Sequence, residues 1–223
     1  LGVLFELSAR LGNTDDVDQL LVACCDGIRR ALGFERVVIE VAEPGTDQLR
    51  QRASVGWDTP PGGMTALEEV ERLSVPQYEV EGCYLLPADA AMALVGTAAR
   101  RYESTRNGRG PLAWDHHWLI VPLTNSEGTL VGWVWADDPS DPLLPTREKL
   151  RILRTFANQA VAAVTDAAHV DQLREMARLD DLTGALNRRA FFERLDQELA
   201  RTRRSPEPVT LVLYDLDQFK ALN

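Results

Sequence analysis

The sequence has few cysteines, little positive charge and no long apolar run. It holds 24 Lys and Arg residues against 34 Asp and Glu residues, which gives a net charge of -10. Nucleic-acid duplexes and anionic membrane surfaces attract basic faces, so neither partner is expected. A membrane helix needs about 20 successive apolar residues, and no stretch of the sequence meets that length. The composition therefore predicts a globular protein with no membrane segment.

The three cysteines are Cys24, Cys25 and Cys83. An odd count without metal-ligand spacing is typical of reduced thiols, so we expect a cytoplasmic protein. The sequence also lacks an initiator Met: it begins at Leu1 and stops at Asn223 inside a motif. We therefore expect a piece of a longer protein.

Alternation and turn residues predict a largely β-rich first part. Strands are expected over 36–41, 49–55 and 78–86, from their β-branched and aromatic content. Residues 118–123 and 129–136 flank an Asn-Ser-Glu-Gly connection, which predicts a hairpin. Residues 88–117 are harder to interpret.

A long helix is expected after Pro145, with Thr146 as its cap. Its apolar residues recur in alternating steps of three and four, the pattern of a coiled-coil seam. These residues are Leu150, Leu153, Ala157, Ala160, Val164 and Ala167, and the pattern resumes at Val170 with a break in phase. The seam predicts a homodimer through this helix; the alternative is a helix that packs on its own sheet.

Two carboxylates stand at the end of an apolar run near the C-terminus. Residues 209–214 predict a strand, and Asp215 and Asp217 follow it on one face. Such a pair can hold Mg²⁺, and Lys220 can meet a phosphate. The alternative is a strand that leaves the sheet through a polar turn.

The wider context resembles the start of GGDEF (diguanylate cyclase) domains. Residues 180–191 read D-D-L-T-G-A-L-N-R-R-A-F, and residues 215–223 read D-L-D-Q-F-K-A-L-N. Both segments follow the family pattern, in order and at the usual separation. The resemblance implies a polymerase-palm-like fold that joins two GTP molecules into cyclic di-GMP, with half of the active site from each of two domains.

The resemblance assigns roles residue by residue. Asp215 and the Leu216 carbonyl would bind Mg²⁺, with Asp217 as a further candidate. The GTP-binding positions are Gln218, Phe219, Lys220 and Asn223. The chemistry would be attack of a ribose 3′-hydroxyl on an α-phosphate, assisted by the metal. The glycine-rich acidic hairpin of the family is not among the 223 residues, so this chain alone is expected to be inactive. Residues 180–189 are expected to be structural.

The first 168 residues are similar to GAF sensor domains. The order of helices, strands, irregular middle, hairpin and closing helix carries this resemblance. It implies an α/β (α+β) fold with an antiparallel sheet flanked by helices and a ligand pocket on one face. We therefore expect a GAF domain over 1–168 with its closing helix at 146–168, a connector at 169–179, and a truncated GGDEF part at 180–223.

The GAF ligand is not evident from the sequence. Trp114, His116 and His117 form an aromatic and imidazole cluster that could face a haem or metal, although a packed polar loop is the simpler interpretation. Cys83 could carry a bilin, although no chromophore motif surrounds it. The expected function is the regulatory part of a diguanylate cyclase. The alternative is a non-catalytic signalling protein with a ligand-binding GAF domain and a degenerate GGDEF domain.

Overall fold

The computed structural model describes residues 17–57, 64–96, 104–176, 178–180, 182–202 and 208–214. Contacts divide the chain into two compact units, Leu1–Ala168 and His169–Asn223. The longest helix, α5 (Arg147–Met176), begins in the first unit and ends in the second. Among the helices of the described residues, none has the length and apolar character needed to span a membrane.

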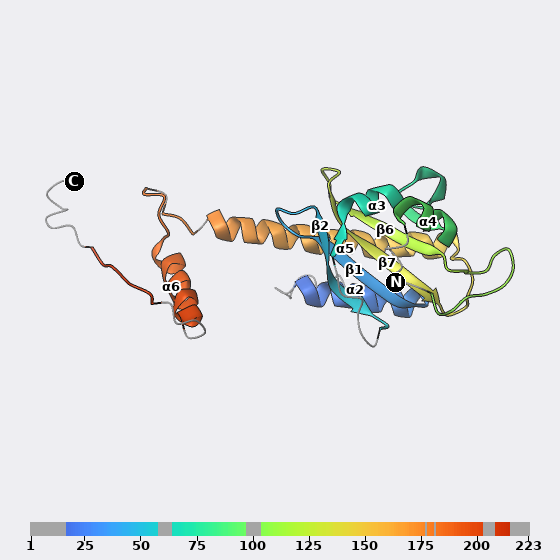
Figure 1. Ribbon diagram of the computed structural model, residues 1–223, viewed down its shortest axis with the longest axis horizontal. Coiled ribbons are helices and arrows are strands. Elements are labelled where there is room, and N and C mark those ends of the chain that lie inside the picture. Colours follow the sequence, from blue (N-terminus) through green and yellow to red (C-terminus); the bar gives the residue numbers. More distant parts are fainter. Residues whose placement is uncertain are drawn as a thin grey trace. The chain divides into compact units, whose positions relative to one another are not determined.

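The described part of the first unit is built on an antiparallel sheet, whose central strands are labelled in Figure 1. Its seven strands lie in the order β3-β2-β1-β7-β6-β5-β4. The strands are β1 (Phe34–Ala42), β2 (Gln48–Val55), β3 (Met64–Ala66), β4 (Glu79–Val80), β5 (Cys83–Leu86), β6 (Trp118–Thr124) and β7 (Leu130–Pro139). The middle strand, β7, pairs with β1 along most of its length. The predicted antiparallel sheet is confirmed.

The predicted hairpin forms between β6 and β7. Asn125 holds its turn, since Asn125 Oδ1 accepts hydrogen bonds from the backbone N–H groups of Glu127 at 3.0 Å and Thr129 at 2.9 Å. A side chain that accepts from its own turn replaces the backbone partner missing there. The turn residues of the sequence thus specify this connection.

The prediction of a single strand over 78–86 was wrong. Residues 76–78 form a short 3-10 turn, and the rest folds into a tight hairpin of β4 and β5. Glu81 and Gly82 have φ angles of 57° and 74°, and two successive positive φ angles define the turn that joins such hairpins. The glycine after Glu81 is the signal that was missed. The hairpin tip contacts α5, where Glu81 pairs with Arg151 at 3.0 Å.

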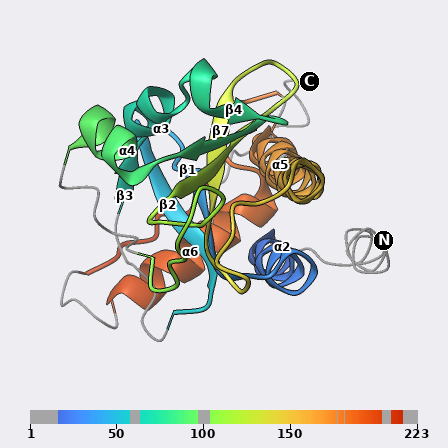
Figure 2. The ribbon, with the colours of Figure 1, turned by 90° about the vertical axis from the view of Figure 1, so that its right-hand side faces the viewer.

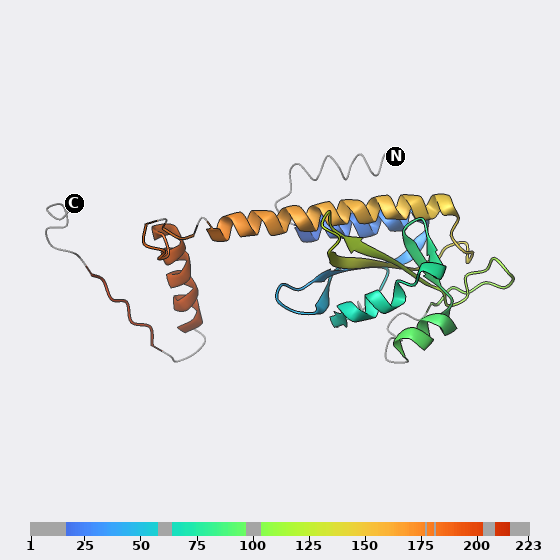
Figure 3. The ribbon, with the colours of Figure 1, turned by 90° about the horizontal axis from the view of Figure 1, so that it is seen from above.

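Helices cover both faces of the sheet. Helix α2 (Val17–Leu32) lies beside α5 on one face, and α3 (Leu67–Leu73) and α4 (Ala88–Val95) lie on the other. Figure 2 shows the sheet between the two helix pairs, and Figure 3 shows the same order from another side. This arrangement requires apolar side chains on both faces of the central strands, which explains why successive residues of β1, Val37, Val38 and Ile39, are all buried.

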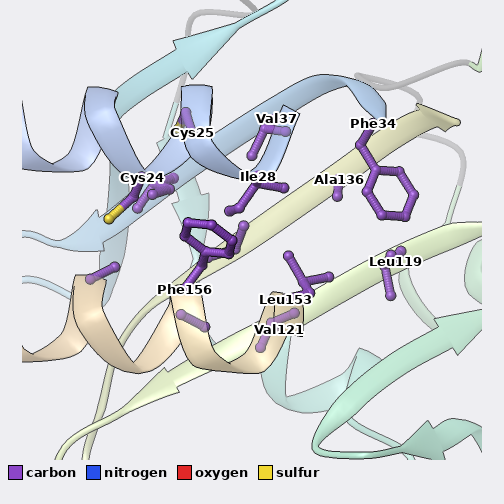
Figure 4. Packing of buried hydrophobic residues seen from close by; sticks show 14 of the residues in the cluster. Cys24, Cys25, Ile28, Phe34, Val37, Leu119, Val121, Ala136, Leu153 and Phe156 are labelled. Carbon is purple, nitrogen blue, oxygen red and sulfur yellow. The ribbon is translucent and has the colours of Figure 1, made fainter. Parts of the chain in front are cut away.

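The core between the sheet and the α2–α5 pair contains the first part of the predicted seam. Four of its residues are at most 1% exposed: Leu150, Leu153, Ala157 and Ala160. They pack with side chains of α2 and of the strands, as Figure 4 shows for Leu153 with Ile28 of α2 and Val121 of β6. Val164 and Ala167 are half-buried, and Val170 is 43% exposed. Up to Ala160 the seam is therefore covered by this domain's own sheet.

The described part of the second unit contains the end of α5, a turn, helix α6 (Arg188–Thr202) and a segment without regular structure. Phe191, Leu195 and Leu199 recur at every fourth position along α6, the spacing of one helix face. The strand predicted over 209–214 was wrong for this structure, because these residues pair with no strand among the described residues. A strand needs the backbone of a neighbour, and without one Leu213 and Tyr214 are 92% and 87% exposed.

Candidate functional site

The residues that the GGDEF resemblance singles out lie outside the described residues. They are Asp215, Leu216, Asp217, Gln218, Phe219, Lys220 and Asn223. Their assignment to metal and GTP remains a prediction.

The turn before α6 is described, and its contacts are internal. Asp180 Oδ1 accepts hydrogen bonds from the Thr183 backbone N–H at 3.0 Å and from the Thr183 hydroxyl at 2.8 Å. These bonds lower the pKa of Asp180, mainly through the Thr183 hydroxyl. Asn187 Oδ1 accepts from the Ala190 N–H at 3.0 Å and so caps α6. The described side chains of this segment therefore have contacts suited to a structural role.

The aromatic and imidazole candidates of the first unit fix the loop before β6. Trp114 is fully buried, and its Nε1 donates to Ser104 Oγ at 3.0 Å. His117 lies against the Trp114 ring at 5.7 Å, and its Nδ1 accepts from the Asp115 backbone N–H at 3.0 Å. Burial lowers the pKa of His117. His116 bonds through its backbone N–H to Asn107 Oδ1 at 2.8 Å.

Cys83 faces the α5 side of the sheet. It is fully buried, and its thiol donates to the backbone carbonyl of Leu150 at 3.5 Å. Burial raises the pKa of the Cys83 thiol to about 12, so the thiolate that a covalent attachment needs is scarce at neutral pH. The contacts of Cys83 are those of a packing residue. No three His, Cys, Asp or Glu side chains gather around a possible metal position in the part of the chain that the structure describes.

Three buried carboxylates were missed by sequence reasoning. Glu40, Asp137 and Asp138 are at most 2% exposed. Glu40 interrupts an apolar strand, and its Oε2 accepts from Trp133 Nε1 at 2.8 Å. The Trp133 ring meets Trp135 at 5.6 Å in the layer under α3 and α4. A charged residue inside a β-branched run, and an Asp pair directly after one, were the available signals.

Asp138 ties the loop at residues 104–106 to the sheet. Its Oδ1 accepts from the backbone N–H groups of Thr105 at 2.6 Å and Arg106 at 3.0 Å. Its Oδ2 accepts from the Thr105 hydroxyl at 2.6 Å and pairs with Arg36 Nε at 3.1 Å. Both oxygens are thus used, and the burial of this charge is compensated.

The carboxylate of Asp137 has fewer hydrogen-bond partners than that of Asp138. The Trp114 indole is a pure donor, so Ser104 Oγ accepts from it and donates its own proton to Asp137 Oδ1, at 2.5 Å. Asp137 Oδ2 is buried with no hydrogen-bond partner among the described residues. Burial raises the pKa of Asp137 to about 6, against the lowering effect of Ser104. The carboxyl group therefore changes charge close to neutral pH.

This shift predicts a pH dependence of stability. The native pKa of about 6 exceeds the unfolded value, so the native state binds the proton more tightly. Stability from this group is fully present below about pH 4 and is lost as pH rises through about 6. Asp137→Asn is expected to raise the free energy of unfolding at pH 8 by about 1–3 kcal/mol and to change it little at pH 4. Urea unfolding at both pH values measures this.

A matched control is Asp141→Asn. Asp141 is exposed, and hydrogen bonds and charge from Lys149 and its own loop lower its pKa against the opposing effect of burial. Its replacement should not raise stability at pH 8. Equal pH slopes for the wild type and Asp137→Asn would show that Asp137 does not titrate in the native state near neutral pH.

Two family models match this chain, one over each part. Residues 16–164 match the family model of the GAF domain. Because this match covers more than half of the chain, the chain belongs to the GAF domain family. Residues 177–223 match the family described as diguanylate cyclase, GGDEF domain. The expected pairing of GAF and GGDEF domains is confirmed.

Curated relatives match over short stretches. The chain is 36% identical over 105 residues to an uncharacterized protein of Mycobacterium tuberculosis, which covers 46% of this chain and 16% of that protein. It is 43% identical over 56 residues to the diguanylate cyclase DgcP of Pseudomonas aeruginosa, covering 25% and 8%. It is 42% identical over 79 residues to the cyclic di-GMP phosphodiesterase NbdA of the same organism, covering 34% and 10%. The chain therefore spans less than a fifth of these relatives.

Solved structures agree on the fold of the first unit. A methyl-accepting chemotaxis protein fragment, residues 122 to 287, superposes with a TM-score of 0.55 at 23% identity, covering 74% of this chain and 98% of that one. The GAF domain of an Acinetobacter phosphoenolpyruvate-protein phosphotransferase gives 0.55 at 15% identity, covering 76% and 94%. At these identities the likeness concerns the fold alone.

Proposed function

We propose that this chain is the sensory and regulatory part of a diguanylate cyclase, in which the GAF domain controls conversion of two GTP molecules into cyclic di-GMP. The observation that carries the proposal is the GGDEF match over 177–223, which starts directly after α5. That helix begins in the GAF core and runs without interruption to Met176. A continuous helix is a direct physical link between the two domains.

Within this proposal the residues after 214 hold substrate and metal. Asp215 and the Leu216 carbonyl would hold Mg²⁺, with Asp217 nearby in sequence, since oxygen ligands suit this hard cation. The backbone N–H groups of Gln218 and Phe219 would meet the phosphates, and Asn223 the guanine. Lys220 would add positive charge beside the phosphates. Bound Mg²⁺ would supply charge stabilisation for attack on the α-phosphate.

The test uses a longer protein that contains this chain and a complete GGDEF domain. Incubated with GTP and Mg²⁺, it is expected to form cyclic di-GMP, measured by chromatography. Residues 1–223 alone are expected to form none. Asp215→Asn in the longer protein is the matched control and should abolish the product.

A second candidate function has its own support. The relative NbdA is named as a cyclic di-GMP phosphodiesterase, and it matches this chain over 79 residues at 42% identity. Because that relative is named for a different activity, the match supports the second candidate, a non-catalytic signalling protein with a ligand-binding GAF domain and a degenerate GGDEF domain. GTP binding by the longer protein without cyclic di-GMP formation would select this candidate over the first.

We also propose a homodimer through the distal part of α5. Its proximal apolar side chains are used by the sheet, while Val170 is 43% exposed. Two GGDEF half-sites must meet for the proposed reaction, and parallel pairing of this helix would bring them together. Light scattering of the longer protein measures its mass, and a monomer that still forms cyclic di-GMP at the same concentration would contradict this proposal.

A further inference from the structure

A polar cleft of about 370 Å³ lies where β1 begins and where β2 and β7 end. Its size is at the lower end of the range for small-molecule sites. It is lined by Arg29, Glu35, Arg36, Gly56, Trp57, Thr105, Arg106 and Asp138. Three guanidinium groups and two carboxylates give it a positive balance, in a chain whose net charge is -10.

The two carboxylates differ in what they can offer a ligand. Asp138 is buried, and both of its oxygens accept hydrogen bonds from the protein. Glu35 is 38% exposed and faces two guanidinium groups. Three charged groups of the lining therefore remain partly open to solvent: the Glu35 carboxylate and the half-exposed guanidinium groups of Arg29 and Arg106.

The contacts of Glu35 are long. Arg29 Nε lies 3.7 Å from Glu35 Oε2, and Arg106 Nη1 lies 3.6 Å from Glu35 Oε1. Both distances exceed hydrogen-bond length, and exposed pairs of this kind contribute about 0–1 kcal/mol. Guanidinium groups bind phosphate and carboxylate through two parallel N–H bonds, which are shorter and stronger. A ligand oxyanion can therefore compete with Glu35.

The walls of the cleft are fixed by the backbone. Gly56 has a φ angle of 87°, and a Cβ there would lie 1.9 Å from the Glu35 carbonyl oxygen, so only glycine allows this approach. The Arg106 N–H is tied to buried Asp138 at 3.0 Å. The Arg36 guanidinium lies over the Trp57 ring at 5.6 Å. Fixed walls reduce the ordering that binding requires.

We propose that this cleft binds a small multivalent oxyanion between Arg29 and Arg106, with Glu35 as an internal competitor for the same guanidinium groups. The shared chemistry is that of a phosphate ester or a polycarboxylate. This site belongs to the GAF unit and does not depend on GGDEF catalysis.

The test is calorimetric titration of the 223-residue chain with pyrophosphate and, separately, with citrate, at constant ionic strength set by chloride. Arg106→Gln and Arg29→Gln should each weaken binding about 10-fold, the loss of roughly one charge-assisted contact. Glu35→Gln should tighten binding about 3-fold, because it removes the competitor. Thermal unfolding midpoints establish that each variant is folded. If one of the two Arg variants does not fold, the other still tests the proposal.

The matched control is Arg50→Gln. Arg50 pairs with Glu43 at 2.6 Å and does not line the cleft. The Arg50→Gln variant should bind each anion as tightly as the wild type does. Binding of pyrophosphate but not citrate identifies a phosphate site, and binding of citrate but not pyrophosphate identifies a carboxylate site. Either result supports the proposal. The proposal is overturned by no binding of either anion at about 10 mM, a concentration above any affinity of interest. Equal weakening by Arg50→Gln and Arg106→Gln overturns it too, since that pattern reflects net charge only.

Discussion

Asp138→Ala is expected to destabilise the GAF domain by about 3–5 kcal/mol, the cost of breaking a buried ion pair from one side. The variant leaves Arg36, whose side chain is 20% exposed, without the carboxylate that it meets at 3.1 Å. It also removes the acceptor for the backbone N–H groups of Thr105 and Arg106. Thr105 and Arg106 are exposed, so water can replace part of this lost hydrogen bonding, and most of the expected cost comes from the pair with Arg36.

Urea unfolding of the wild type and the variant measures this difference. Asp141→Ala serves as the control, because Asp141 forms an exposed pair with Lys149 at 3.1 Å. An exposed pair of that kind contributes about 0–1 kcal/mol. If Asp138→Ala costs no more than Asp141→Ala, Asp138 does not anchor the 104–106 loop.

Leu153→Ala is expected to cost about 2–5 kcal/mol, because it removes a fully buried side chain and leaves a cavity. Leu153 contributes to the layer between α5 and the sheet within one chain. Its loss should therefore lower the melting temperature by the same amount at every protein concentration. A residue that stabilised a dimer would show a loss that depends on concentration.

Asn158→Ala is the matched control on the same helix. Asn158 is exposed and lies outside the proposed dimer contact, so its truncation should change stability by less than about 0.5 kcal/mol. A concentration-dependent effect of Leu153→Ala would instead place that residue between two chains. Calorimetric scans over a hundredfold range of concentration separate the two results.

The seam on α5 shows what periodicity can predict and what it cannot. Alternating steps of three and four correctly predicted a helix with one apolar face. The same spacing occurs in a helix that packs on the helix of a second chain and in a helix that packs on its own sheet, because each buries one apolar stripe. Only the tertiary arrangement places Leu150 and Leu153 against β-strands. The fold was predictable, whereas the partner of this face was not.

The candidate site shows a similar division. The central strands and the β6–β7 hairpin follow from β-branched content and turn residues. The role of Asp138 does not, because its partners Thr105 and Arg106 are more than thirty positions away and come from a stretch without periodicity. Glu81 likewise looked like a strand residue, and its left-handed conformation becomes visible only in the hairpin. Polar residues that serve distant partners leave no local pattern.

The buried cysteines make this protein convenient for site-directed labelling. All three are free and buried, and burial raises the pKa of Cys24 and Cys83 to about 12 and that of Cys25 further still. Maleimides and spin labels react with accessible thiolate, which these residues do not present at neutral pH. A single cysteine introduced on an exposed turn of α5 would therefore be the reactive thiol of an otherwise native chain. Probes that report on this helix can be attached without first rebuilding the core.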